Sequence, residues 1–173
     1  SMMAVYDPVS VPNNKFGIHI LFTSELVQAA KLVNSGGGAW GYVIIPIRSD
    51  DRNLIKWQTF LDQTKSLQVI PIFRLATYPD GPTWTKPTIY DPIDWTNFLD
   101  SLDWPTKNRY IIVYNEPNHA NEWGGEVNPN EYSKQLFWTI DELKKRSDKF
   151  FVLPAGLDAS VPDSTNSMEE YSF

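Results

Sequence analysis

Five short runs of hydrophobic residues, each bounded by turn-forming residues, recur along the chain. Several are rich in Ile and Val and do not alternate apolar with polar positions, which is typical of strands buried on both faces. We expect strands over Phe16–Leu21, Gly41–Ile47, Val69–Leu75, Tyr110–Tyr114 and Phe150–Ala155.

The segments between these runs carry apolar residues at helical spacing, each after a residue that can cap a helix. We expect three such helices, which begin after Ser24, Asp51 and Asp94. A fourth has the clearest start, because Asn128 can cap it, Pro129 suits the first helical position and Glu131 completes a capping box. This last helix is predicted to run to about Arg146.

The order is therefore strand then helix, repeated four times and followed by a fifth strand. Such an order predicts a parallel sheet with right-handed crossovers, either a doubly wound open sheet or a (β/α)8 barrel. A nucleotide-binding open sheet needs a Gly-rich loop after its first strand, and the segment Leu21–Ser24 lacks one. The Gly36–Gly38 run follows the first helix, where it is expected to end that helix. We therefore expect an α/β fold of the TIM-barrel type, incomplete, with about five βα units.

Composition narrows the possible partners. Of 173 residues, 42% are hydrophobic and 21% are charged, which is ordinary for a globular domain. A net charge of −6 disfavours nucleic acid and anionic membranes as partners. There is no Cys and no apolar run long enough to cross a bilayer. The 14% of aromatic residues exceed the needs of a core of this size, so some are expected at a surface or cleft.

The start of the chain, Ser-Met, resembles the scar of a cleaved tag. We interpret residues 1–14 as tag scar and lead-in, and residues 15–173 as the N-terminal part of a barrel. A natural signal peptide is compatible with this start, so a secreted or cell-surface location is favoured without being fixed.

Polar residues cluster where the predicted strands end: His19, Arg48, Arg74, Asn115 with Glu116, and Asp158. In a barrel these ends meet on one face, where active sites are built. Asn115 and Glu116 directly follow a buried strand, and Pro117 forbids the strand to continue. A carboxylic acid held there is suited to protonating the leaving oxygen of a glycosidic bond, while a second carboxylate faces the anomeric carbon.

The segment Asn115-Glu116-Pro117 at the end of a fourth strand resembles the (β/α)8 glycoside hydrolases of clan A, the superfamily of cellulases, β-glycosidases and β-xylosidases. The resemblance extends from Lys15 to Asp158. It implies a retaining hydrolase in which Glu116 is the acid/base and Asn115 contacts the sugar 2-hydroxyl. It also places His119 and Arg74 at positions similar to substrate-pocket residues.

The chain departs from that family in one respect. Clan members carry their nucleophilic Glu at the end of a seventh strand, whereas this chain ends after the fifth, with a capping-box pattern at Ser167–Glu170 that predicts a further helix. Glu122, Glu126 and Asp158 do not match the nucleophile. We therefore expect the nucleophile to lie outside this chain, and the chain alone to be nearly inactive.

Two tryptophans, Trp84 and Trp123, lie in loops rich in Pro, Gly and Asn, where their rings can stack on sugars or pack within the loop. Trp40, Trp57 and Trp95 are instead expected in the core or against helices. His19 and His119 lie on distant strands without metal-ligand spacing, so we expect no metal and no cofactor.

Other interpretations of the same residues remain open. Glu116 is also suited to bracing a loop, His119 to a structural hydrogen bond, and Arg48 and Arg74 to ion pairs at the strand ends. The protein is then a catalytically inactive carbohydrate-binding protein, or a self-assembling half barrel with a site between two copies. Because five strands leave two open edges, we expect a homodimer or association with a C-terminal barrel fragment.

Overall fold

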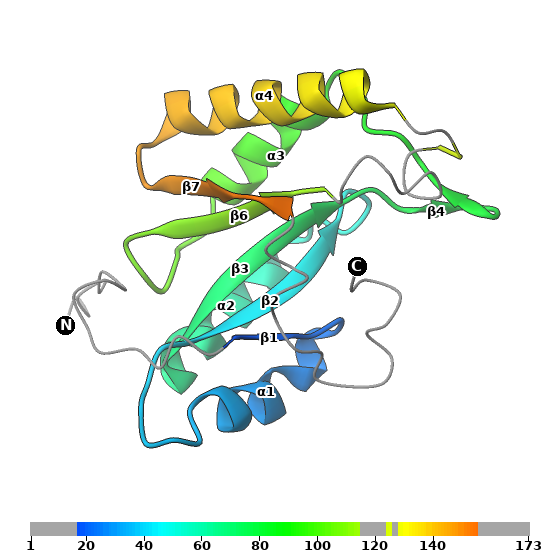
Figure 1. Cartoon of the computed structure of the whole chain (residues 1–173). Coiled ribbons are helices and arrows are strands. Elements are labelled where there is room, and N and C mark those ends of the chain that lie inside the picture. Colours follow the sequence, from blue (N-terminus) through cyan, green and yellow to red (C-terminus); the bar gives the residue numbers. More distant parts are fainter. Residues whose placement is uncertain (1–16, 115–123, 126–127, 156–173) are drawn as a thin grey trace.

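A five-stranded parallel sheet is the centre of the computed structural model, which describes residues 17–114, 124–125 and 128–155 (Figure 1). Its strands are β1 (Gly17–His19), β2 (Gly41–Arg48), β3 (Val69–Ala76), β6 (Arg109–Val113) and β7 (Phe150–Leu153). They lie side by side in chain order, and every neighbouring pair is parallel. All five predicted strands are confirmed, and each predicted end lies within two residues of the observed one.

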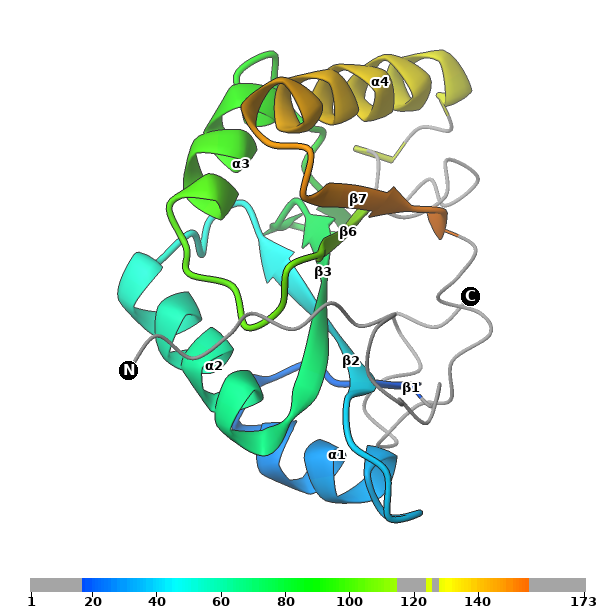
Figure 2. The same cartoon turned by 90° about the vertical axis from the view of Figure 1, so that its left-hand side faces the viewer.

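Four α-helices connect these strands. They are α1 (Leu26–Val33), which follows the short 3₁₀ turn η1 (Thr23–Glu25), α2 (Leu54–Leu67), α3 (Asp91–Asp100) and α4 (Pro129–Arg146). Apolar residues of all four helices share one buried cluster with the sheet. Figure 2 shows the helices as an arc on one side of the strands. The fold is therefore an α/β domain with helices on one face of a parallel sheet.

The alternation of side chains along each strand divides the sheet into two faces. On β2, Val43, Ile45 and Ile47 belong to the helix-facing cluster. On the opposite face, Ile44, Ile72 and Ile112 form a second, separate cluster across three neighbouring strands. Both faces are apolar, which explains why the strand sequences show no period of two.

Two of the predicted helix starts are wrong by a few residues. Helix α2 is capped by Asn53, whose Oδ1 accepts a hydrogen bond from the Lys56 N–H at 3.0 Å, whereas Asp51 forms an ion pair with Lys56. Helix α3 begins at Asp91, so Asp94 lies inside its first turn. A carboxylate in the first turn and one at the cap give the same sequence pattern, because both favour a helix N-terminus.

The start and end of α4 are confirmed. Asn128 Oδ1 accepts from the Glu131 N–H at 3.1 Å, Pro129 is the first helical residue and Arg146 is the last. Helix α1 ends at Val33, and the glycine run that follows includes Gly37 at φ 84°.

Aromatic rings fill the core between the helices and β3. The ring of Phe73 contacts the rings of Trp57 and Trp104 edge to face, with centroids 5.5 and 5.2 Å apart. Trp104 in turn meets Phe150 of β7 at 6.1 Å. Edge-to-face pairs at these distances are favourable beyond the area that they bury. As expected, Trp40, Trp57 and Trp95 are buried.

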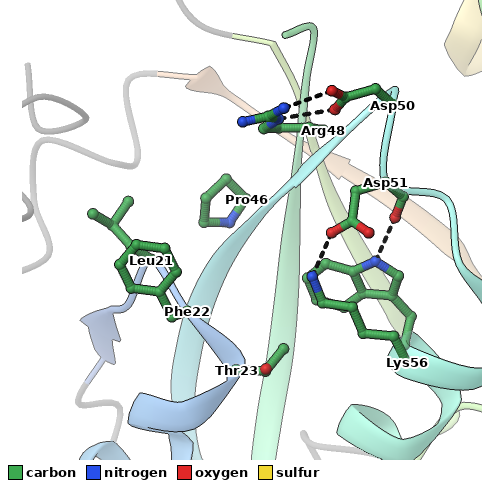
Figure 3. A pocket seen from close by; sticks show the side chains of 9 residues that line it. Leu21, Phe22, Thr23, Pro46, Arg48, Asp50, Asp51 and Lys56 are labelled. Carbon is green, nitrogen blue, oxygen red and sulfur yellow. Dashed lines mark hydrogen bonds and ion pairs between the residues drawn. The ribbon is translucent and has the colours of Figure 1, made fainter. Parts of the chain in front are cut away.

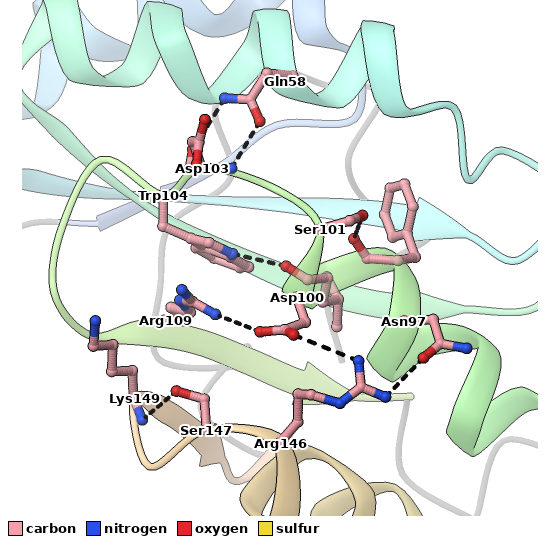
Figure 4. Close-up of polar contacts among 12 residues, drawn as sticks. Gln58, Asn97, Asp100, Ser101, Asp103, Trp104, Arg109, Arg146, Ser147 and Lys149 are labelled. Carbon is pink, nitrogen blue, oxygen red and sulfur yellow. Dashed lines mark hydrogen bonds and ion pairs between the residues drawn. The ribbon is translucent and has the colours of Figure 1, made fainter.

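Polar contacts fasten the amino end of β6 to the helices around it (Figure 4). Asp100, the last residue of α3, accepts from Arg109 of β6 at 3.1 Å and from Arg146 of α4 at 3.4 Å. Arg146 also donates to Asn97 at 2.8 Å. One carboxylate thus joins the ends of three elements.

The connections before and after β3 differ in length. At the amino edge, a single residue, Gln68, joins α2 to β3, and it adopts a left-handed backbone at φ 56°. At the carboxyl edge, residues 77–90 join β3 to α3 and include the hairpin of β4 (Pro79–Asp80) and β5 (Thr83–Trp84). The hairpin was not predicted, although Asp80-Gly81 is a turn sequence and Gly81 has φ 63°. No helix among the described residues is long and apolar enough to span a membrane.

The cap of α2 yields a test of these helix boundaries. We expect Asn53→Ala to lower the free energy of unfolding by about 1 kcal/mol, because it removes the acceptor of a free helical N–H. The exposed amide Gln63 in the middle of α2 is the matched control, and Gln63→Ala is expected to be close to neutral. Urea unfolding of both variants measures the difference, and equal midpoints contradict the assignment of the cap.

Candidate active site

The carboxyl ends of the five strands meet at one edge of the sheet, because all five are parallel. Of the predicted site residues, His19 ends β1, Arg74 lies near the end of β3 and Trp84 lies in the hairpin that follows β3. The remaining predicted site residues, Asn115, Glu116, His119, Trp123 and Asp158, lie outside the described part of the chain.

His19 and Arg74 share the face of the sheet that points away from the helices. His19 is in register with Ile44 on β2, and Arg74 is in register with Pro46, two residues further along β2. Both side chains are only 1% exposed. Burial of an imidazole or a guanidinium is costly unless the group has hydrogen-bond or charged partners, so neither residue is a simple surface side chain.

Arg48 has the ion-pair arrangement that was one interpretation of the strand-end arginines. Its Nε and Nη2 donate to the two carboxylate oxygens of Asp50 at 2.8 and 2.5 Å. These hydrogen bonds hold the pKa of Asp50 below its ordinary value. Arg48 is half exposed whereas Arg74 is buried, so the two arginines occupy different environments.

The residue that precedes Asn115 has an unusual backbone. Tyr114 directly follows β6 and has φ 57°, in the left-handed region that a bulky side chain rarely adopts. Its N–H donates to the Leu75 carbonyl at 3.1 Å, so the pairing with β3 continues through this residue. Strained backbone persists where its surroundings hold it in place, and such residues cluster at functional sites.

The Tyr114 side chain is held on the helix-facing side. Its hydroxyl accepts a hydrogen bond from Trp95 Nε1 at 3.2 Å, and both rings are buried. Burial raises the pKa of the Tyr114 hydroxyl above its ordinary range, with the Asp91 carboxylate acting in the same direction. The phenol is therefore neutral near neutral pH.

Arg52 connects this pair to the start of α3. Its Nη2 donates to Asp91 Oδ1 at 2.5 Å, and its guanidinium lies over the Trp95 ring, 4.2 Å from the centroid. Asp91 Oδ2 also accepts from the Thr88 N–H at 2.6 Å. A chain of contacts thus runs from the loop after β2, through α3, to the residue before Asn115. Sequence patterns did not reveal this chain, because its members are distant in sequence.

The hairpin that follows β3 contacts Gly124, which lies between β6 and α4 in the sequence. The Trp84 carbonyl accepts from the Gly124 N–H at 2.9 Å. Gly124 has φ 62°, and a Cβ there would approach Lys86 Cγ to 2.9 Å. Lys86 forms an ion pair with Glu131 of α4 at 3.5 Å. Partly exposed Trp84 thus lies beside Gly124, at the carboxyl edge.

A pocket of about 580 Å³ lies between the loops that follow β1 and β2. Phe22 and Asp50 line it and were not predicted as site residues. One isolated Phe between a strand and a helix carries no distinctive pattern. In the part of the chain that the structure describes, no group of three or more His, Asp or Glu is placed to hold a metal ion.

These observations define the class of the protein: an α/β domain with a five-strand parallel sheet, and polar groups at the carboxyl edge of that sheet. No protein-family model matches the sequence, and no curated protein matches it either.

The Tyr114–Trp95 hydrogen bond is open to a double-mutant cycle. Tyr114→Phe leaves the Trp95 N–H buried without its acceptor, and we expect a loss of about 1–3 kcal/mol in the free energy of unfolding. Trp95→Phe removes the donor, and the double variant is expected to lose less than the sum of the single changes. Denaturant unfolding measures the coupling. Strict additivity contradicts a direct interaction.

Proposed function

We propose that this protein is part of a retaining glycoside hydrolase, which cleaves O-glycosidic bonds in carbohydrates with Glu116 as the acid/base. The observation that carries the proposal is the end of β6. The strand pairs with β3 as far as Tyr114, whose backbone is strained and whose ring is fixed by Trp95. Asn115 and Glu116 follow Tyr114 directly in the sequence, which supports a position for them at the carboxyl edge.

The chemistry fits neutral carbohydrate. A protonated carboxylic acid donates to the departing glycosidic oxygen, and a second carboxylate attacks or stabilises the anomeric carbon. Arg74, which is buried on β3 next to β6, is a cation. It favours the ionised form of a carboxylate, which is the form that the second carboxylate needs. His19, Trp84, His119, Trp123 and Asp158 are the proposed substrate contacts beside Asn115. The proposal involves no metal and no cofactor.

The strand order supports a barrel as the complete architecture. A doubly wound sheet reverses its strand order at a switch point, whereas the described strands run from one edge to the other in chain order. Among them, β1 pairs with β2 alone and β7 with β6 alone. We propose that further βα units of a barrel join these edges and supply the nucleophile.

Native mass spectrometry of the purified protein tests this arrangement. We expect the 19.8 kDa chain to be held together with a polypeptide that supplies the remaining strands, because an unpaired strand edge is a template for pairing with another chain. A homodimer supports instead a self-assembling half barrel with a site between copies. A monomer at micromolar concentration contradicts both arrangements.

The role of Glu116 is tested in the assembly that contains the second carboxylate. Glu116→Gln removes the transferable proton and is expected to lower kcat on glycosides by several orders of magnitude. Glu142→Gln, near the C-terminal end of α4, is the control and should leave kcat unchanged. If Glu116→Gln retains full hydrolysis, the assignment is wrong. If the unchanged protein does not hydrolyse glycosides, and it binds glycans as well as the Glu116→Gln variant does, a carbohydrate-binding protein is favoured.

A further inference from the structure

A second pocket lies at the opposite edge of the sheet, where β6 and β7 begin. Arg109 is the first residue of β6, Lys149 directly precedes β7, and both line this amino-edge pocket. Its volume is about 520 Å³, which is in the range of small-molecule sites. Tyr114 lies five residues beyond Arg109, or about 16 Å along an extended strand. The amino-edge pocket is therefore separate from the candidate active site.

Positive charge gathers in the amino-edge pocket, although the chain as a whole carries a net charge of −6. Among the described residues, its lining contains four cations and two carboxylates, namely Lys65, Lys107, Arg109 and Lys149 against Asp62 and Asp103. The cations come from the last turn of α2, the start of β6 and the turn before β7. A concave surface with an excess of one charge raises the local concentration of ions of the opposite sign. The pocket is therefore suited to an anion.

The three lysines of the amino-edge pocket have no counter-ion within the described part of the chain. No carboxylate there lies within ion-pair distance of the Nζ of Lys65, Lys107 or Lys149. The pocket between the loops that follow β1 and β2 differs in this respect, because Arg48 and Lys56 there each pair with a nearby aspartate (Figure 3). An anion that enters the amino-edge pocket thus meets ammonium groups without first displacing a carboxylate from them.

Arg109 is held in position by its surroundings. Its Nη1 donates to Asp100 at 3.1 Å, and its guanidinium lies over the ring of Phe150, 5.0 Å from the centroid. The Arg109 N–H also donates to the Lys149 carbonyl at 2.9 Å, so the two basic residues begin side by side. A guanidinium has five N–H donors, and among the described residues Asp100 is the one acceptor for its hydrogen bonds. The remaining donors are available to a ligand.

The loop before β6, which forms one wall of the pocket, is fixed to α2 by Gln58 (Figure 4). Gln58 Oε1 accepts from the Asp103 N–H at 2.8 Å, and Gln58 Nε2 donates to the Asp103 carbonyl at 3.1 Å. The next residue, Trp104, is buried, and its Nε1 donates to the Leu99 carbonyl at 2.9 Å. Because these contacts order the wall in advance, a ligand loses little free energy in ordering it.

The charges and the volume of the pocket indicate the chemistry of its ligand. Lysine binds phosphate groups as a point charge, and the planar guanidinium of Arg109 can contact two phosphate oxygens at once. The electrostatic gain grows with the charge of the ligand, so a multivalent anion is favoured over a monovalent one. A volume in the range of small-molecule sites also exceeds what a single inorganic ion fills.

We propose that the amino-edge pocket binds a small molecule that carries two or more phosphate groups, through Lys107, Lys149 and Arg109, with Lys65 beside them. The bound anion contacts α2, β6 and the turn before β7 together, so it stabilises this edge of the sheet. The site does not depend on the proposed glycosidase activity, because it uses none of the residues at the carboxyl edge.

Calorimetry of the purified protein at constant ionic strength tests the site with inorganic phosphate, pyrophosphate and a hexose bisphosphate. We expect one-to-one binding of pyrophosphate or the bisphosphate, with a higher affinity than for phosphate. If the bisphosphate binds more tightly than pyrophosphate, the ligand is an organic phosphate. If pyrophosphate binds at least as tightly, the site recognises the phosphate groups alone.

Two double variants locate the binding. Lys107→Gln with Lys149→Gln is expected to weaken binding of pyrophosphate or the bisphosphate roughly tenfold, because two exposed charge contacts are lost. Lys31→Gln with Lys134→Gln is the matched control. These lysines are exposed on α1 and α4, so the control changes the net charge equally and should leave the affinity almost unchanged. Equal affinities of the two double variants overturn the site.

Asp103→Asn gives a result of the opposite sign, which a loss of fold cannot imitate. The change removes a carboxylate that repels the anion, and it keeps the backbone hydrogen bonds to Gln58. We expect affinity to rise by about two- to threefold. Unchanged or weaker binding contradicts a site beside Asp103. Failure of both pyrophosphate and the bisphosphate to bind the unchanged protein also overturns the proposal, even if a polyanion such as heparin binds.

Discussion

The direction of the strands is the constraint on which the rest of this structure depends. Each strand of the main sheet runs the same way as its neighbours, so every connection has to cross back along the sheet. The crossover segments become helices, and all four described helices bury their apolar residues against one face. The carboxyl ends of the strands consequently share one edge, and among the described residues His19, Arg48 and Arg74 come to it from three different strands.

The sequence predicts the frame well, for a physical reason. A strand buried on both faces must be continuously apolar, and Gly41–Ile47 and Val69–Leu75 have no other plausible structure between helical segments. Helix α4 carries its cap, its first-turn Pro and its basic last turn in the local sequence, so its limits are predictable. The starts of α2 and α3 are less so, because Asp51 and Asp94 satisfy the same local rules as the true first residues.

The sequence predicts which residues lie at the candidate site better than it predicts the contacts that hold the site in place. Polar residues after apolar runs identify the edge, and they single out His19 and Arg74. The chain of contacts from Arg52 through Asp91 and Trp95 to Tyr114 has no local signal, since it joins three elements far apart in sequence. The left-handed backbone of Tyr114 is likewise invisible in the sequence, because Gly or Asn would be expected there. Tertiary contacts offset the energetic cost of this backbone conformation.

The unequal connections before and after β3 have a consequence for how such a protein diversifies. At the amino edge, Gln68 alone turns the chain from α2 into β3, and an inserted residue there would shift the register of the strand. At the carboxyl edge, residues 77–90 include a hairpin that pairs with itself. Insertions and deletions are therefore tolerated in the connection after β3 and selected against in the connection before it. Around β3, changes of length are thus confined to the carboxyl edge, while the register of the sheet stays the same.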